Sequence, residues 1–388
     1  MTKPQRYRFL DLYRGLIVLL MLEGHVLRAL LTLDAQRGPL FTLHELLHGL
    51  IGPGFLFGAG FSFAIGTQRR LEALTSVTPM FFRRLWRALF IFFLGYAIHI
   101  PYLSLAKTIL HGTPQQFDVL FAFDILQCIG ITLLGLRIIL LFLKKETWFI
   151  HSLFMLLLLI VYATPLVWTK EIELLLPRFL VGAVSGHQGA FFPLFPSAAF
   201  LLAGVIVAWL FLRKAQEGTE HRFLQQLLIV GIILIGGGYL VDALPVNSYP
   251  AYNFWYTSPN YFWMRLGGLF LLLTSLWFFE SYVTHRDRHD IWMPMWLILL
   301  GVESFVVYIA HLVILYGWVI NGQCSMSFWW GWKLNIWESI LAWVALTLLM
   351  AFLATGWQYL KKNHPVVMQG IYWYLNILFL YYFLTSMY

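Results

Sequence analysis

Long apolar stretches recur along the whole chain, and they constrain the fold more than any other feature of the sequence. Eleven of them approach or exceed the 20 or so residues that carry an α-helix across a bilayer. They cover about 10–33, 49–67, 81–103, 117–143, 147–167, 192–212, 223–244, 262–284, 294–320, 335–360 and 366–387. Because lipid offers no partner to backbone polar groups, such stretches cross as helices. The sequence predicts an all-α, polytopic helical bundle, residues 1–388 forming one transmembrane domain without a separate soluble domain. The count falls to ten if one aromatic-rich segment lies at the interface.

Composition supports a membrane protein. Of the 388 residues, 60% are hydrophobic and 11% charged, whereas soluble domains carry about 25% charged residues. The net charge of +8 resides in short loops, where it indicates membrane orientation, so we do not expect a nucleic-acid partner. The basic N-terminus runs directly into an apolar stretch without a small-residue cleavage site, which predicts a retained helix. Two cysteines, Cys128 and Cys324, predict no disulfide.

Lysine and arginine are concentrated in alternate loops, which orients the chain. With the N-terminus inside, the inner loops hold Lys3, Arg6, Arg8, Arg69, Arg70, Arg83, Arg84, Arg87, Lys144, Lys145, Arg213, Lys214, Arg222, Arg286, Arg288, Lys361 and Lys362. The outer side holds Arg28, Arg37, Lys107, Lys170, Arg178, Arg265 and Lys333. Cytosolic loops of membrane proteins are enriched in these residues. The pattern predicts a cytosolic N-terminus and an external C-terminus.

The first apolar stretch carries an unusual set of ionisable residues. Within 10–33 lie Asp11, Arg14, Glu23, His25 and Arg28. At about 100° per residue, Arg14 and His25 are nearly eclipsed and roughly 16 Å apart along the axis. With Asp11 and Arg28 they form one polar stripe, whereas Glu23 lies opposite Arg14 and needs a separate partner. Ionisable groups inside a membrane helix are costly and usually functional.

Arginines gather at the inner ends of the second and third stretches. Arg69 and Arg70 are followed by Arg83, Arg84 and Arg87, the last three within about one helical turn. Such a cluster suits anionic lipid headgroups, or it suits the phosphates of a nucleotide-bearing donor such as coenzyme A, because arginine makes bidentate phosphate contacts. Both interpretations stay open.

Two histidines, His44 and His48, precede the second apolar stretch on the outer side. Their i, i+4 spacing suits a metal ion, but no second pair of ligands accompanies them, so we expect no metal. An external general base and an ordinary interfacial role remain alternatives. The second stretch itself is rich in glycine, which indicates either tight helix packing or close approach of backbone to a ligand.

A late stretch, GVESFVVYIAH, places Glu303, Ser304, Tyr308 and His311 in one segment. Ser304, Tyr308 and His311 share one helical face. Glu303 and His311 can form an acid–base pair or a proton relay, or serve as structural hydrogen-bonding groups. The aromatic loops at 247–265 and 321–333 are typical of interfacial belts, and a stacking platform for an acceptor is the alternative.

Several motifs, taken together and in order, resemble a known group of membrane enzymes. LDLYRG with His25 resembles the Arg-x10-His pattern of the membrane acyltransferase-three proteins. PGFLFGAGFSFAI, RRLWR, DILQCIG and GVESFVVYIAHLVIL resemble, in the same order, motifs of that group and of the catalytic domain of heparan-alpha-glucosaminide N-acetyltransferase and its bacterial relatives. The resemblance spans most of the chain.

The resemblance implies an acyl-CoA-dependent acyltransferase in the bacterial inner (plasma) membrane. An acyl group, typically acetyl, would pass from cytosolic acyl-CoA to a hydroxyl or amine, such as that of a glycan, on the outer side. Donor binding would fall to Asp11, Arg14, Arg83, Arg84 and Arg87. Catalysis would fall to His25. His44 and His48 are further candidates, since the heparan branch has Asn at the first-helix position and uses a loop histidine, and Glu303 and His311 are candidates through their own place in a membrane helix. Acetyl-CoA would be a co-substrate, with no metal cofactor.

Two other functions fit the same residues. A transporter or flippase can use the polar stripe as a path for substrate or protons, and broken helices in paired halves would favour it. A structural or assembly protein with incidental polar contacts is the third. The sequence leaves the acceptor, the acyl chain and homo-oligomer formation open.

Overall fold

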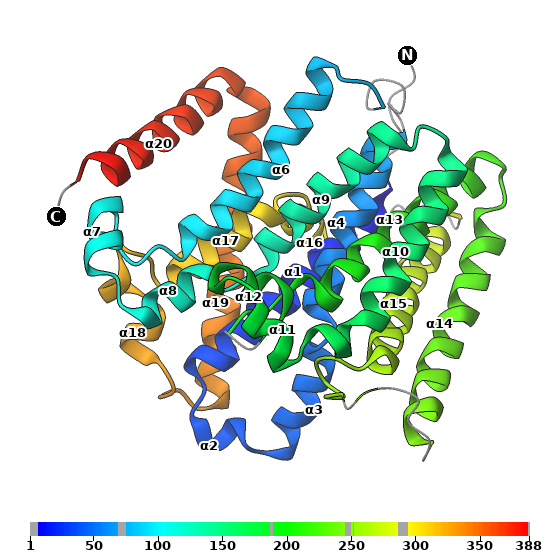
Figure 1. The fold of residues 1–388 in the computed structure, drawn as a ribbon, viewed down its shortest axis with the longest axis horizontal. Coiled ribbons are helices and arrows are strands. Elements are labelled where there is room, and N and C mark those ends of the chain that lie inside the picture. The colour runs from blue at the N-terminus through cyan, green and yellow to red at the C-terminus, as the bar shows by residue number, and fades with distance from the viewer. Residues whose placement is uncertain are drawn as a thin grey trace. The chain divides into compact units, whose positions relative to one another are not determined.

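Helices make up the regular structure throughout residues 7–68, 75–186, 189–244, 250, 252–285 and 294–386, the ranges that the computed structural model describes (Figure 1). Within these ranges the sheet-like pairing is a single bridge between Leu31 and Leu334, so the predicted all-α class is confirmed. Several predicted positions lie outside the described residues. They are Lys3, Arg6, Arg69, Arg70, Arg286, Arg288 and part of the aromatic run after 247.

The chain divides into two compact units, each described here by itself. Unit 1 comprises Met1–Ile51, Ile100–Pro114 and Ser275–Tyr388. Its helices are α1 (Arg8–Leu30), α2 (Leu33–Gln36), α3 (Pro39–His48), α7 (Leu105–His111), α16 (Met295–Val302), α17 (Ser304–Leu315), η1 (Gly322–Cys324), α18 (Met326–Trp330), α19 (Ile336–Asn363) and α20 (Pro365–Thr385). Helix α1 packs against α16, α17, α18, α19 and α3 and is the central helix of this unit.

Two glycines allow α1 and α16 to cross at very short range. A Cβ atom on Gly15 would overlap the carbonyl oxygen of Leu297, and one on Gly301 would overlap the carbonyl oxygen of Asp11. Small residues at such a crossing let the backbones approach, which is how membrane helices gain packing energy. The crossing fixes α1 beside the segment that continues into α17.

The C-terminal end of α1 is held by a loop from much later in the chain. The backbone amide of Leu334 donates to the carbonyl of Leu30, and Thr32 donates to the carbonyl of Leu334, at 2.9 and 3.0 Å. The indole of Trp332 donates to the carbonyl of Arg28 at 3.1 Å. Carbonyls that a helix end leaves unpaired are thereby satisfied.

Unit 2 comprises Gly52–His99 and Gln115–Thr274. Its helices are α4 (Ile51–Gln68), α6 (Pro79–Ile98), α8 (Pro114–Phe121), α9 (Ile125–Phe142), α10 (Glu146–Val167), α11 (Lys170–Leu175), α12 (Arg178–Val184), α13 (Leu194–Gln216), α14 (Glu220–Ala243) and the first part of α15 (Pro259–His285). Helix α13 packs against α9, α10 and α14, and α6 packs against α9. Most side chains of α13 are buried, so it forms the core of this unit.

Glycines of the second apolar stretch serve helix packing in unit 2. A Cβ on Gly60 of α4 would overlap the carbonyl oxygen of Leu201, and one on Gly204 of α13 would overlap that of Phe57. The contact is reciprocal, each helix offering a glycine to the other's backbone. At Gly60, therefore, the packing interpretation of this glycine-rich stretch applies.

Eight helices of the described residues are long and apolar enough to cross a membrane, and a bent pair, α16 with α17, can supply a ninth span. Helices α1 and α6 contain 23 and 20 residues, but every 18-residue window in them holds at least three charged residues. The protein is therefore an integral, multi-pass membrane protein. The count of eleven, which requires α1 and α6 to cross as well, stays a prediction, as does the orientation.

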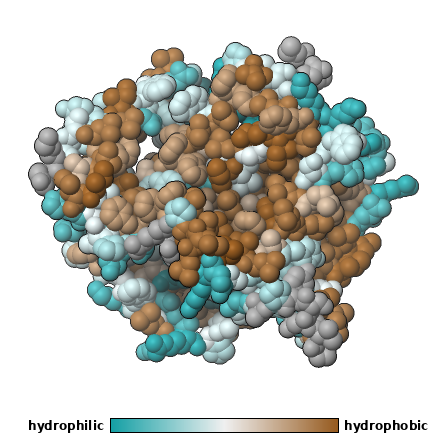
Figure 2. Space-filling model, viewed as in Figure 1, coloured by the Kyte–Doolittle hydropathy of each residue, from teal (hydrophilic) through white to brown (hydrophobic). Residues whose placement is uncertain are grey.

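Exposed side chains agree with lipid contact. Large apolar side chains are spread over the face seen in Figure 2. Among them are Leu348 and Phe352 of α19, which expose 66% and 78% of their surface. Contiguous apolar surface on this scale is rare in soluble monomers.

Two predicted stretches are interrupted by acidic residues. The stretch 117–143 divides into α8 and α9 because Asp124 caps α9: its carboxylate accepts from the amide of Ile125 at 2.7 Å, and Gln127 completes a capping box. The stretch 294–320 breaks at Glu303, where α16 and α17 meet at 86°. Neither stretch is a single straight helix, and apolar character alone did not reveal these breaks.

The α1–α16 crossing can be tested with two glycine substitutions. We expect Gly15→Ala to lower stability by about 1–3 kcal/mol, because its new methyl group must displace backbone. In Gly356→Ala of α19 the methyl group meets no atom within 4 Å, so this control should be neutral or slightly stabilising. Thermal unfolding in detergent measures both, and equal melting temperatures would contradict the close crossing.

Candidate functional site

A pair of stacked histidines joins α1 to α17 inside unit 1. Nδ1 of His25 lies 2.8 Å from Nε2 of His311, and the ring centroids are 5.0 Å apart. His311 is fully buried, and His25 is half-buried. Both histidines belong to segments that the sequence analysis identified as candidates, but the predicted partner of His311 was Glu303.

The hydrogen bonds of this pair determine which nitrogen carries each proton. Nδ1 of His311 lies 3.0 Å from the carbonyl oxygen of Val307, and a carbonyl only accepts, so that nitrogen carries the proton. In the neutral ring, Nε2 of His311 is then an acceptor. His25 must donate to it from Nδ1, which leaves Nε2 of neutral His25 with its lone pair. His311 thus fixes His25 in the tautomer of a base.

Arg14 makes a second contact from the same face of α1 to the same helix. Its guanidinium donates to the hydroxyl of Ser304 at 2.9 Å. The stripe predicted from helical spacing is therefore confirmed for Arg14 and His25, both of which contact α17. Arg28 departs from it, since its guanidinium pairs with Glu45 of α3 at 2.5 and 3.0 Å.

Glu303 and His311 have different partners, so the predicted acid–base pair is not formed. Glu303 stands at the break between α16 and α17 and is 4% exposed. The ammonium of Lys361 from α19 lies 2.7 Å from its carboxylate. The reason is geometric: the 86° bend at Glu303 breaks the single straight helix that the sequence predicted for Glu303 and His311.

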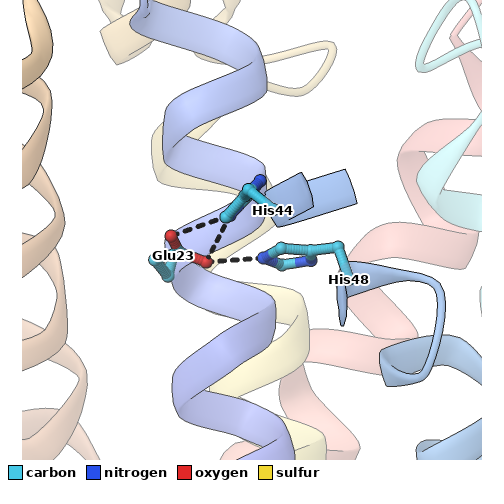
Figure 3. A group of neighbouring side chains, drawn as sticks. All are labelled: Glu23, His44 and His48. Atoms are coloured by element: carbon cyan, nitrogen blue, oxygen red, sulfur yellow. Dashed lines mark hydrogen bonds and ion pairs between the residues drawn. The ribbon is translucent and has the colours of Figure 1, made fainter. Parts of the chain in front are cut away.

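Glu23, on the other side of α1, is bonded by both histidines of α3 (Figure 3). Nε2 of His44 lies 2.8 and 2.9 Å from its two carboxylate oxygens, and Nε2 of His48 lies 2.5 Å from one of them. The three side chains are 9–20% exposed. The separate partner that Glu23 required is therefore this histidine pair.

Helix α3 turns its polar side toward α1 and its apolar side away. Leu40, Leu43 and Leu47 are exposed, whereas His44 and His48 are half-buried against α1. This is the reverse of a soluble surface helix and suits a helix that faces lipid. It explains how two histidines come to face one carboxylate.

In unit 2, the predicted basic cluster occupies the first half of α6. Arg83 and Arg87 are exposed, whereas Arg84 is half-buried, with its guanidinium near Gly66 of α4. Arg84 also interacts electrostatically with Arg137 of α9. The guanidinium of Arg137 stacks on the ring of Phe63 at 4.4 Å, and one buried nitrogen, Nη1, has no hydrogen-bond partner.

Aromatic loops remain open to either interpretation. In the first, Tyr252 donates to Asp242 at 2.8 Å, and burial, with that hydrogen bond, raises the pKa of the Tyr252 phenol. In the second, Trp329, Trp330 and Trp332 are exposed. Exposed indoles suit both an interfacial belt and a stacking surface.

Comparison with known proteins identifies the family. Residues 6–241, more than half of the chain, match the family described as heparan-alpha-glucosaminide N-acetyltransferase, catalytic. The chain belongs to this family. Membership indicates an acetyltransferase embedded in a membrane, and it confirms the resemblance seen in the motifs. No curated protein matches the chain.

The matched range divides the site residues of this acetyltransferase-family protein. His25, His44, His48 and the arginines of α6 lie inside it, whereas Glu303 and His311 come later in the chain. Sequence reasoning missed Glu45, Lys361 and Arg137 as members of these clusters. Each is a charged residue that the structure pairs with, or places near, a predicted site residue. For Glu23 alone did the sequence indicate in advance that a further partner was required.

The Glu303–Lys361 pair yields a double-variant test. Lys361→Ala should destabilise the protein by roughly 1–3 kcal/mol, because a buried carboxylate loses its ionic partner. Adding Glu303→Gln removes the unpaired charge and should restore part of the loss. Thermal unfolding of the four proteins of the cycle measures the coupling, and strictly additive effects would show that the ion pair contributes nothing.

Proposed function

We propose that this protein transfers an acetyl group from cytosolic acetyl-CoA to an acceptor hydroxyl or amine, such as that of a glycan, at the outer side of the membrane. The observation that carries the proposal is the His25–His311 pair, which presents a half-buried imidazole base on the central helix. Family membership supports the acetyl transfer itself. The donor, the acceptor and the direction are parts of the proposal.

In the proposed step, Nε2 of His25 takes the proton of the acceptor X–H as X attacks the thioester carbonyl. The new X–C bond forms, the C–S bond breaks, and the leaving coenzyme A thiolate then takes the proton from His25, which restores the neutral base. The proton on His25 gives a cation whose Nδ1–H still donates to His311. General base catalysis of this kind contributes about 10²–10⁴-fold in rate. His311 touches no reacting atom in this scheme and acts as a positioning residue.

The arginines of α6 are proposed to bind the donor's phosphates. Arg83 and Arg87 expose their guanidinium groups one turn apart, and Arg84 and Arg137 add positive charge behind them. Arginine recognises phosphate through paired N–H groups. Asp11 and Arg14 remain candidates for donor contacts, although Arg14 already donates to Ser304.

One observation favours transport as a second candidate function. The α16–α17 pair bends by 86° at a buried, paired glutamate, and broken helices often build transporter binding sites. Among the described residues only this pair has such a bend. A paired break in the other half, which the transporter interpretation requires, is therefore not found there.

Replacing the proposed base tests the enzyme function directly. With acetyl-CoA as donor and glucosamine as acceptor probe, His25→Ala should lower kcat about 10²–10⁴-fold and leave acetyl-CoA binding intact. His311→Leu should lower kcat with little change in KM, whereas His311→Gln, which can still accept from His25, should recover part of it. The readout is acetylated product measured by mass spectrometry.

His151→Ala is the matched control, since His151 is an exposed histidine of α10 bonded to its own helix. Its activity should equal that of the wild type. Absence of acetyl-CoA binding by the wild type would overturn the enzyme proposal. Normal turnover by His25→Ala would overturn the assignment of the base. Release of one equivalent of coenzyme A without acceptor would show a covalent acyl-enzyme instead of direct transfer.

Donor binding through phosphates can be tested with two donors. In the variant with Arg83→Gln and Arg87→Gln, KM for acetyl-CoA should rise about tenfold or more, because each charged hydrogen bond contributes about 1.5–3 kcal/mol. KM for acetyl-pantetheine, which lacks the nucleotide, should not change. Arg213→Gln with Lys214→Gln removes the same charge from α13 and is the control. Equal effects on both donors would contradict phosphate recognition.

A further inference from the structure

We infer that Glu23, His44 and His48 form a binding site for a divalent transition-metal ion, with Zn²⁺ as the ion that the ligands suit best. One ligand atom from each residue lies within 4.8 Å of the others. Two imidazole nitrogens and one carboxylate oxygen are a ligand set of catalytic zinc sites. The sequence analysis noted this pair of histidines but did not connect it with the third ligand, Glu23, which lies more than 20 residues earlier on α1.

In its neutral form, His44 uses its two ring nitrogens more fully with a metal bound than without one. In the neutral ring, donation from Nε2 to Glu23 leaves Nδ1 as an acceptor. That buried Nδ1 has no hydrogen-bond partner and lies 3.8 Å from the carboxylate of Glu45, which is also an acceptor. A metal on Nε2 moves the proton to Nδ1, which then faces a carboxylate that can accept it.

Glu45, 3.8 Å from Nδ1 of His44, stands near the position that a carboxylate commonly takes beside a metal-bound histidine. Ligand histidines usually direct their second nitrogen at a carboxylate, which fixes the ring and raises its basicity. Glu45 is itself held by Arg28 through two hydrogen bonds of 2.5 and 3.0 Å. Arg28 thus positions Glu45, and Glu45 lies beside the ring of His44, whose Nε2 is the proposed ligand atom.

The backbone of α1 leaves room for the other ligand ring. A Cβ on Gly24 would overlap the His48 imidazole, so only glycine lets this ring approach Glu23. Ligand atoms around a tetrahedral Zn²⁺ with bonds of about 2.0–2.2 Å are roughly 3.3 Å apart. The present nitrogen-to-oxygen separations of 2.5–2.9 Å need to grow by less than about 1 Å.

Three protein ligands leave a coordination position open. In zinc enzymes that position holds water or substrate. The three side chains retain partial exposure, so a small ligand can reach it. Glu23 lies two residues from His25 in sequence but on the other side of α1, so metal binding is argued independently of the proposed acetyl transfer.

Metal content tests the site. Protein purified in detergent without a polyhistidine tag is stripped with chelator, dialysed against Zn²⁺ and measured by mass spectrometry. We expect about one Zn²⁺ per chain for the wild type and for His151→Ala, and almost none for Glu23→Gln or His48→Ala. Glu45→Gln should keep the stoichiometry and weaken binding about 10–100-fold in chelator competition.

Two outcomes would overturn the site. One is wild-type protein that takes up no more Zn²⁺ than the Glu23→Gln variant. The other, which needs no variant to fold, is Co²⁺-loaded wild type whose visible spectrum matches hexa-aqua Co²⁺ instead of a four-coordinate nitrogen and oxygen site. Acetyl transfer is assayed separately on stripped protein, so a failed metal site and a failed enzyme proposal give different results.

Discussion

The burial of ionisable side chains on α1 is the constraint on which unit 1 depends. A helix that carries Arg14, Glu23 and His25 into the interior of a bundle requires a partner for each of them. The structure supplies Ser304 and His311 from α17 on one side, and the histidines of α3 on the other. Helices α3 and α17 are therefore held to α1 by polar contacts at defined positions as well as by packing. These contacts specify the rotation of α1 far more narrowly than apolar surface would.

The same contacts assign a chemical role to each side of the helix. Toward α17, the tautomer imposed by Val307 through His311 leaves a basic nitrogen on His25. Toward α3, two imidazoles share one carboxylate, which is a ligand set for a metal. Proton transfer and metal coordination both need neutral imidazole nitrogens at fixed distances. One helix can provide both because residues 23 and 25 lie about 160° apart around its axis, as two steps of roughly 100° imply.

The sequence was sufficient for the class of fold and for much of α1, and insufficient where distant segments meet. Hydropathy predicts helices well because lipid leaves the backbone few alternatives. The eclipsed spacing of Arg14 and His25 correctly placed both on one face of α1, and that face contacts α17. The break at Glu303 escaped prediction because periodicity assumes a straight helix. The pairing of Glu23 with His44 and His48 escaped it because helical spacing gives directions around one axis and says nothing of which helix lies there. The sequence showed that Glu23 needs a partner, but it did not show which residues provide it.

The outward-facing leucines of α3 have a consequence for how the histidine pair responds to disruption. The exposed side chains of Leu40, Leu43 and Leu47 suit contact with lipid, while Glu23 and Arg28 hold the opposite side of α3 to α1. Loss of the contact between Glu23 and the two histidines does not favour moving α3 into water, because its leucines would then be exposed to water. The angle of α3 about its own axis is therefore set by a few charged and polar pairs with α1, because the apolar side alone defines that angle only loosely.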